Sequence, residues 1–298
     1  MVEFNSALQA GIRIGTPILF AGLGEVLLER SGIINIGIEG VMLSGAFSGF
    51  CAGWYWQSPL AGACAGMLGG ALMMLVFALF VLRLSADQIV TGMAINLVAL
   101  GLTGTAWLKI SGRRALEAPT FKPLLENMKT IPILGPLLFS QTLLTWIAFA
   151  CVGLLWFYFE RSERGLELRA VGENPDAAQA SGINVLRCRW KACVVSGALA
   201  GLGGAFLTIS QTGSFAPNCT KGRGFVALAA VVLGRYGAVG TALACMFFGF
   251  AFYSRDALSS DVPTDLVEML PYALTIVALC LKSQTRTAPA ALGKPYAR

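Results

Sequence analysis

Long apolar runs, broken by short polar stretches, follow one another along the chain. A helix rises about 1.5 Å per residue, so about 20 apolar residues cross a hydrocarbon core of about 30 Å. Runs of roughly this length lie at about residues 6–28, 33–56, 60–82, 86–108, 138–159, 190–211, 217–234, 237–254 and 264–281. The pattern predicts an all-α fold, a polytopic transmembrane helix bundle of about nine spans, in which some helices are broken or re-entrant.

Two polar segments interrupt the bundle, at about residues 109–137 and 160–189. If the second lies in the cytoplasm, alternation puts thirteen basic residues on the inner side and eight on the outer side. Lys and Arg concentrate on cytoplasmic loops, so the bias favours an outer N-terminus and a cytoplasmic C-terminus. We expect one transmembrane domain, residues 1–298, with a cytoplasmic loop at about 160–190.

Composition supports a membrane protein and removes several classes of chemistry. The chain is 56% hydrophobic and 13% charged, with a mean hydropathy of +0.69, whereas soluble domains carry about 25% charged residues. It has no histidine, and its eight cysteines are scattered, so histidine triads, histidine-dependent metal motifs and disulfide frameworks are not expected. The net charge of +6 indicates orientation rather than nucleic-acid binding.

Glycines recur every four residues inside several predicted spans. Such spacing places them on one helix face, where a second backbone approaches closely. The pattern therefore predicts a tightly packed bundle and says nothing of a solute. The glycines concerned are Gly45, Gly49, Gly53, Gly62, Gly66, Gly70, Gly197 and Gly201.

Three polar residues lie inside apolar runs, where they need partners. Glu39 either pairs with a basic residue or lines a solute path, because ionisable groups in a membrane are costly and commonly functional. Asn35 lies four residues earlier, on the same face of the expected helix. Asn96 needs hydrogen bonds, which we expect from neighbouring helices sooner than from a polar solute. Ser85 to Gln88 is expected to cap the start of a helix.

The run between Arg223 and Arg235 is short for a span, which is typical of the broken helices found at transporter binding sites. Phe215 and Phe225 flank its start. Either ring has the shape to stack on a base or sugar, but lone aromatics more often pack or anchor at the interface. Both interpretations stay open.

The polar segment 170–183 predicts one short helix on the inner face. Asn174 is a good N-cap, Pro175 suits the first helical position, Asp176 favours the positive end of the helix dipole, and Gly182 can end the helix. An isolated helix of this kind is suited to docking another protein.

The same segment resembles a known motif. Asp176-Ala177-Ala178, followed after three residues by Gly182, is similar to the Glu-Ala-Ala-x-x-x-Gly coupling motif of ATP-binding-cassette importer permeases. With the runs at residues 30–40, 222–230 and 288–296, which fall in the same order, the chain resembles the nucleoside and simple-sugar ABC permease family, related to branched-chain amino acid permeases. The first residue of the triplet here is Asp176 rather than Glu, which puts only the detailed contact in doubt.

This resemblance implies a permease for nucleosides or related purine compounds in the bacterial cytoplasmic (inner) membrane. The implied partners are a second permease subunit forming a heterodimer, a cytoplasmic ABC ATPase and an extracytoplasmic solute-binding protein. The residues implied to couple to the ATPase are Gly172, Glu173, Asn174, Pro175, Asp176, Ala177, Ala178 and Gly182. The candidate translocation path is Asn35, Glu39, Asn96 and Phe225.

The chain carries no G-x-x-x-x-G-K-[ST] loop, since its one Gly-Lys pair, Gly293-Lys294, runs into Pro295. We therefore expect no cofactor on this chain, with ATP and magnesium bound by the partner ATPase, and no enzyme activity of its own. Simple sugars and branched-chain amino acids remain alternative solutes. The main rival function is a secondary transporter that uses an ion gradient through Glu25, Glu39 or Asp87.

Overall fold

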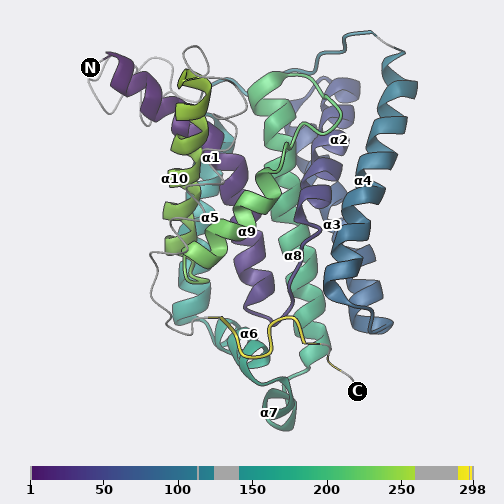
Figure 1. Ribbon diagram of the computed structural model, residues 1–298, viewed down its shortest axis with the longest axis vertical. Coiled ribbons are helices and arrows are strands. Elements are labelled where there is room, and N and C mark those ends of the chain that lie inside the picture. The colour runs from purple at the N-terminus through teal and green to yellow at the C-terminus, as the bar shows by residue number, and fades with distance from the viewer. Residues whose placement is uncertain (1, 113, 124–140, 259–287, 295, 297–298) are drawn as a thin grey trace.

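Ten α-helices run through the residues that this computed structural model describes, 2–112, 114–123, 141–258, 288–294 and 296 (Figure 1). No strand occurs within these ranges. The helices are α1 (Val2–Glu29), α2 (Ile38–Trp56), α3 (Pro59–Ala78), α4 (Gln88–Ser111), α5 (Leu143–Arg161), α6 (Glu163–Glu173), α7 (Pro175–Ala180), α8 (Val185–Phe206), α9 (Arg223–Leu233) and α10 (Ala238–Leu258).

Five stretches of helix are long and apolar enough to cross a membrane: Ala7–Glu29, Pro59–Arg83, Gln88–Ser111, Leu143–Arg161 and Val185–Thr212. Two of these include a π-helical turn, after α3 and after α8. The prediction of an all-α, multi-pass membrane bundle is confirmed.

Three predicted spans need comment. The span at 33–56 begins only at Ile38, since the residues before it form a turn and an extended segment. The span at 217–234 contains just the eleven-residue α9, preceded by turns, so the short helix expected between Arg223 and Arg235 is confirmed. The predicted span at 264–281 lies outside the described residues.

Helices α1 and α8 form the centre of the bundle. In the apolar parts of these helices, 83% and 78% of residues are buried, against 22% in α4 and 28% in α5. The exposed faces of α3, α4 and α5 carry large apolar side chains such as Leu72, Leu97 and Leu154. Lipid tails are an apolar solvent, so these three helices have the surface expected of the lipid-facing rim.

The four-residue glycine pattern lies where α2, α3 and α8 meet. A Cβ on Gly45 would overlap the backbone of Gly201, and a Cβ on Gly70 would overlap the backbone of Gly197. Because packing rather than the hydrophobic effect holds helices together in lipid, such backbone contact is a main source of cohesion. The predicted packing role of these glycines is confirmed.

The two ends of the bundle differ. α6, α7 and the C-terminal segment 288–294 gather at one end, whereas the start of α1 lies at the other (Figure 1). In the orientation expected from the basic residues, the end that carries α7 is the cytoplasmic one.

Candidate functional site

The short helix predicted in the polar loop is present as α7. The Asn174 side chain accepts a hydrogen bond from the backbone N–H of Ala177 at 3.1 Å, and Pro175 occupies the first helical position. The N–H of Ile183 donates to the carbonyl of Ala178 at 3.0 Å, and Gly182 adopts a left-handed φ of +87°. This C-terminal pattern is a Schellman motif, which satisfies carbonyls that a helix end leaves free. The predicted cap and stop residues are therefore confirmed.

One face of α7 packs and the other is open. Ala178 is buried against Val171 and Val185, whereas Asp176 and Ala177 are exposed. Small side chains on an exposed, well-capped helix leave its backbone accessible to a partner surface. The arrangement is suited to docking, with α7 held to the described bundle through its two ends and the buried Ala178.

The base of α7 is tied to the C-terminal segment 288–294, which we call the strap. Ala291 donates its N–H to the Gly172 carbonyl at 3.0 Å, and Ala290 donates to the Glu173 carboxylate at 3.3 Å. Further along, Gly293 donates to the carbonyl of Gly32 at 3.1 Å. The strap thus connects the end of α6 to the turn that follows α1.

Glu39 caps another helix from inside the bundle. Its two carboxylate oxygens each accept a backbone N–H, from Gly222 and from Gly224, both at 2.7 Å. These amides lie at the start of α9, where the helix dipole favours a negative charge. Only 8% of Glu39 is exposed. Of the two interpretations left open for Glu39, these bonds favour a structural anchor, with backbone amides and a helix dipole compensating its charge.

One face of α4 holds the irregular segment before α2. Asn96 accepts the N–H of Gly40 at 2.7 Å and donates to the carbonyl of Ile36 at 3.0 Å. Gln88, two turns earlier, accepts the N–H of Ile34 at 2.8 Å. Between them, a Cβ on Gly92 would overlap this segment's backbone. The partners of Asn96 are thus within the protein, as predicted, but Gln88 serves this contact rather than a helix cap.

Asn35 lies in that irregular segment and not on a helix. Its Oδ1 accepts the N–H of Gly37 at 2.9 Å, and its own N–H donates to Glu25 at 3.1 Å. The prediction that Asn35 shares a helical face with Glu39 is wrong, because the chain leaves the helical conformation between Glu29 and Ile38. Both side chains nevertheless belong to one buried polar junction, which we define as residues 33–40 with their partners on α1, α4 and α9.

The two phenylalanines separate clearly. Phe215 is buried in an aromatic cluster with Phe47, Phe50 and Trp107 at centroid distances from 5.2 to 6.4 Å, so it packs. Phe225 follows the capped Gly224 in the first turn of α9, and 43% of it is exposed. Of the four path residues predicted, three come together in the junction, and Phe225 stands at its surface.

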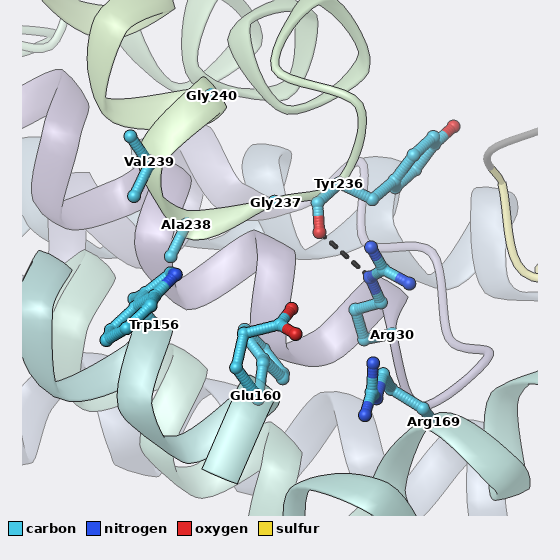
Figure 2. Close-up of a pocket in the computed structure, with 10 residues that line it drawn as sticks. Arg30, Trp156, Glu160, Arg169, Tyr236, Gly237, Ala238, Val239 and Gly240 are labelled. Atoms are coloured by element: carbon cyan, nitrogen blue, oxygen red, sulfur yellow. Dashed lines mark hydrogen bonds between the residues drawn. The ribbon is translucent and has the colours of Figure 1, made fainter.

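A second polar cluster lies at the α7 end, between α5, α6 and the α9–α10 turn (Figure 2). Arg30 donates from Nε to the carbonyl of Tyr236 at 2.8 Å, and Arg169 and Glu160 face the same cavity of about 330 Å³. Burial and the neighbouring Arg169 lower the pKa of Arg30. Burial, with a contribution from Glu29, raises the pKa of Tyr236, so its hydroxyl stays neutral at physiological pH. The cluster joins the ends of four helices.

Sequence reasoning missed two residues that the structure makes prominent. Arg189, counted as a loop cation, is 1% exposed; it donates to the Ser31 carbonyl at 3.1 Å and lies over the Tyr296 ring at 5.5 Å. The Arg13 guanidinium donates to the backbone carbonyl of Gln211 at 2.8 Å, and the side-chain amide of Gln211 donates to the backbone carbonyl of Arg13 at 2.7 Å. The one available signal was an arginine at the edge of, or inside, an apolar run.

Asp87 is the N-cap of α4, since its carboxylate accepts the N–H groups of Ile89 and Val90 at 2.9 Å. This part of the predicted cap is confirmed.

Burial raises the pKa of the Cys219 thiol to about 11, so it is protonated and weakly nucleophilic at neutral pH. Among the described residues, no group of three His, Cys, Asp or Glu side chains is placed to hold a metal ion.

Comparison with known proteins gives a consistent answer. A family model described as branched-chain amino acid transport system / permease component matches residues 7–279. The guanosine ABC transporter permease protein NupQ of Bacillus subtilis (strain 168) is 37% identical over 295 residues, covering 94% of this chain and 92% of that protein. The nucleoside ABC transporter permease protein NupC of Lactococcus lactis subsp. cremoris (strain MG1363) is 35% identical, covering 94% and 93%.

A solved structure supports the fold. An ABC transporter of the metal-chelate type in an inward-facing conformation matches with a TM-score of 0.54 and 17% identity, over 92% of this chain and 84% of that one. At this identity the likeness concerns the helix arrangement alone.

Proposed function

This chain belongs to the branched-chain amino acid transport system / permease component family, and we propose that it is the membrane-spanning permease subunit of an ATP-binding-cassette importer for nucleosides. The observation that carries the proposal is α7, a capped and exposed helix at one end of a multi-pass bundle. The nucleoside assignment is supported by the two relatives, which are named for guanosine and nucleoside transport. Family members of this kind are transport components and not enzymes.

The coupling role belongs to α7 and the residues at its base. In this proposal the exposed Asp176 and Ala177 enter a groove of a separate cytoplasmic ATPase, which binds ATP and magnesium. Movement of α7 then passes through Gly172 and Glu173, because both contact the strap. The strap and the Gly32 turn carry the movement to residues 33–37, next to the junction.

The translocation path in this proposal runs beside the junction. Asn35, Glu39 and Asn96 hold irregular backbone and the start of α9 in place, so they shape the path by positioning. Phe225 is the residue of the four with an exposed ring, and it is available to stack on a base. α9 is short and broken from the preceding helix, as at many transporter sites.

The remaining partners follow from the same assignment. A second permease subunit completes the path as a heterodimer, and an extracytoplasmic solute-binding protein delivers the solute at the end opposite α7. The protein lies in a bacterial inner membrane with residues 1–298 as one domain, the α7 loop and the C-terminus in the cytoplasm.

A single substitution tests the coupling role. Ala177→Arg places a large charge on the open face of α7, where it blocks docking without disturbing buried contacts. We expect the assembled complex to lose ATP-driven guanosine uptake in proteoliposomes at least ten-fold, whereas Ala177→Ser keeps wild-type uptake. Membrane insertion and subunit assembly, measured by size-exclusion chromatography, should be unchanged in both.

The outcomes separate the alternatives. Wild-type uptake by Ala177→Arg would refute the coupling assignment. Uptake that survives ATP depletion while a membrane potential is held would favour an ion-coupled transporter. Competition of guanosine uptake by glucose or leucine, rather than by other nucleosides, would overturn the solute class while leaving the coupling assignment intact.

A further inference from the structure

A second cavity lies near the α7 end, between α5, α6 and α8. Its volume is about 620 Å³, within the range of sites that hold small organic ligands. It differs from the buried junction because its lining includes exposed side chains such as Leu154, and no step of the proposed transport uses it.

The upper wall of the cavity is apolar and reaches the bundle surface. Leu154 is 68% exposed and Val195 is 44% exposed, and Leu27, Leu155 and Ala192 complete the wall. These positions lie within long apolar helices, so hydrocarbon is their expected solvent. An acyl chain fits such a wall, whereas a free polar metabolite does not.

The lower end is basic. Arg187 and Lys191 lie one turn apart on α8, and Arg164 faces them from α6, with Glu167 as the only acidic residue among the described lining. No hydrogen bond or ion pair of these three cationic groups forms within the described parts of the chain. Their positions at the start of α8 and just beyond α5 put them at the level of the inner headgroups.

The charge distinguishes this cavity from its neighbour in Figure 2. The described lining of the larger cavity carries three basic residues and one acidic residue, a net charge of +2. In the smaller cavity Arg30 and Arg169 face Glu160, a net charge of +1, and the volume is about half. An anionic headgroup with an attached chain therefore matches the larger cavity better.

We propose that the cavity between α5, α6 and α8 binds an anionic glycerophospholipid of the inner leaflet, its phosphate at Arg164, Arg187 and Lys191 and one acyl chain along Leu154 and Val195. Basic pockets between membrane helices on the cytoplasmic side are typical headgroup sites. Ser181, Gly182 and Asn184 line the same cavity. The lipid therefore contacts the segment through which α7 joins α8, and it stabilises the docking helix.

The test measures lipid affinity on the assembled complex. Native mass spectrometry of the complex, titrated with phosphatidylglycerol and with phosphatidylcholine, gives an apparent Kd for each. Each basic residue near an anionic lipid contributes about a five-fold factor, so Arg187→Gln with Lys191→Gln should weaken phosphatidylglycerol binding about 30-fold. Phosphatidylcholine binding should barely change.

A matched control removes two charges elsewhere. Arg161→Gln with Arg235→Gln lowers the net charge equally at exposed positions outside the described lining, and should keep wild-type affinity. Val195→Trp fills the upper wall and should weaken phosphatidylglycerol binding although every charge remains. Uptake should rise with phosphatidylglycerol content for the wild type and the control, and not for Arg187→Gln with Lys191→Gln.

Three results would overturn the proposal. An equal loss of phosphatidylglycerol affinity in the two charge variants would show that net charge alone causes the effect. An unchanged affinity in Val195→Trp would show that the acyl chain does not lie along the upper wall. Stimulation of wild-type uptake by inorganic phosphate in phosphatidylcholine vesicles would assign the cations to a free anion. A disulfide between Val195→Cys and a cysteine placed in 264–281 would show that the chain itself covers the groove. None of these outcomes bears on the solute or on α7 docking.

Discussion

The buried junction and α7 are both rich in polar groups, but they use them in opposite ways. In the junction, Glu39 and Asn96 bond inward to backbone groups of other segments, and Asn35 bonds to Gly37 beside it and to the Glu25 carboxylate. In α7, Asn174 caps its own helix, and the other polar atoms face solvent. Polar residues therefore stabilise the bundle in the first region, and in the second they leave a surface open to a partner.

This contrast predicts that stability and transport separate by region. Substitutions in the junction should lower the free energy of unfolding, and uptake should fall as a consequence. Substitutions on α7 should lower uptake with little effect on stability. Two substitutions in the junction and one in α7, in order of expected stability effect, test the separation.

Glu39→Ala is expected to have the largest effect. It removes two charge-assisted hydrogen bonds, worth about 1.5–3 kcal/mol each, and leaves the amides of Gly222 and Gly224 without an acceptor. The free energy of unfolding in detergent, from titration with sodium dodecyl sulfate, should fall by about 3–6 kcal/mol. Glu117→Ala, an exposed carboxylate on a loop, is the control. If Glu39→Ala and Glu117→Ala had the same free energy of unfolding, the stabilising role given to the junction would be wrong.

Asn96→Leu should have an intermediate effect. Leucine keeps the number of heavy atoms and the branching at Cγ but loses both contacts, with Gly40 and with Ile36. The freed N–H and carbonyl cost about 1–3 kcal/mol. The same unfolding titration measures this change. Thr105→Val removes a hydroxyl from an exposed site on α4, bonded only within its own helix, and should be close to neutral. A larger loss in Thr105→Val would contradict the role given to Asn96.

Asn174→Ala should have the smallest effect on stability. Loss of an N-cap costs about 1 kcal/mol, which changes the ratio of folded to frayed α7 about five-fold, while the bundle keeps its unfolding midpoint. Guanosine uptake should fall several-fold in proteoliposomes. Asn174→Asp retains a capping oxygen and should restore uptake. If Asn174→Ala instead lowers the unfolding midpoint of the whole bundle, α7 contributes to the stability of the core, and the junction and α7 do not differ in the way described.

The two regions also differ in how far the sequence predicts them. α7 was predicted residue by residue, because cap, proline and glycine act within a few positions of one another. The junction depends on contacts such as Glu39 with Gly222, 183 positions apart, which no local pattern contains. The sequence indicated that Glu39 needs a partner. Its partners are backbone N–H groups, which nearly every residue carries, so residue identity could not point to them.

The placement of Asn35 was wrong for a related reason. Its apolar surroundings continue the hydrophobic run, so the pattern extends the helix to residue 33. The extended stretch is stabilised instead by α4, where Gly92 lets its backbone approach closely and Asn96 donates to the Ile36 carbonyl at 3.0 Å. The bundle and its glycine packing were predicted correctly, because repeated four-residue spacing reports on one helix at a time. The coupling and path roles stay predictions for the experiments above.

The strap has a consequence for biosynthesis. It is translated after every described helix, yet it supplies the N–H groups that bond to Gly172 and Glu173 at the base of α7. A ribosome-bound chain therefore inserts its spans before that base is complete. A chain that stopped before residue 288 would therefore carry every described helix, yet it would lack the hydrogen bonds that hold the base of α7 against the turn after α1.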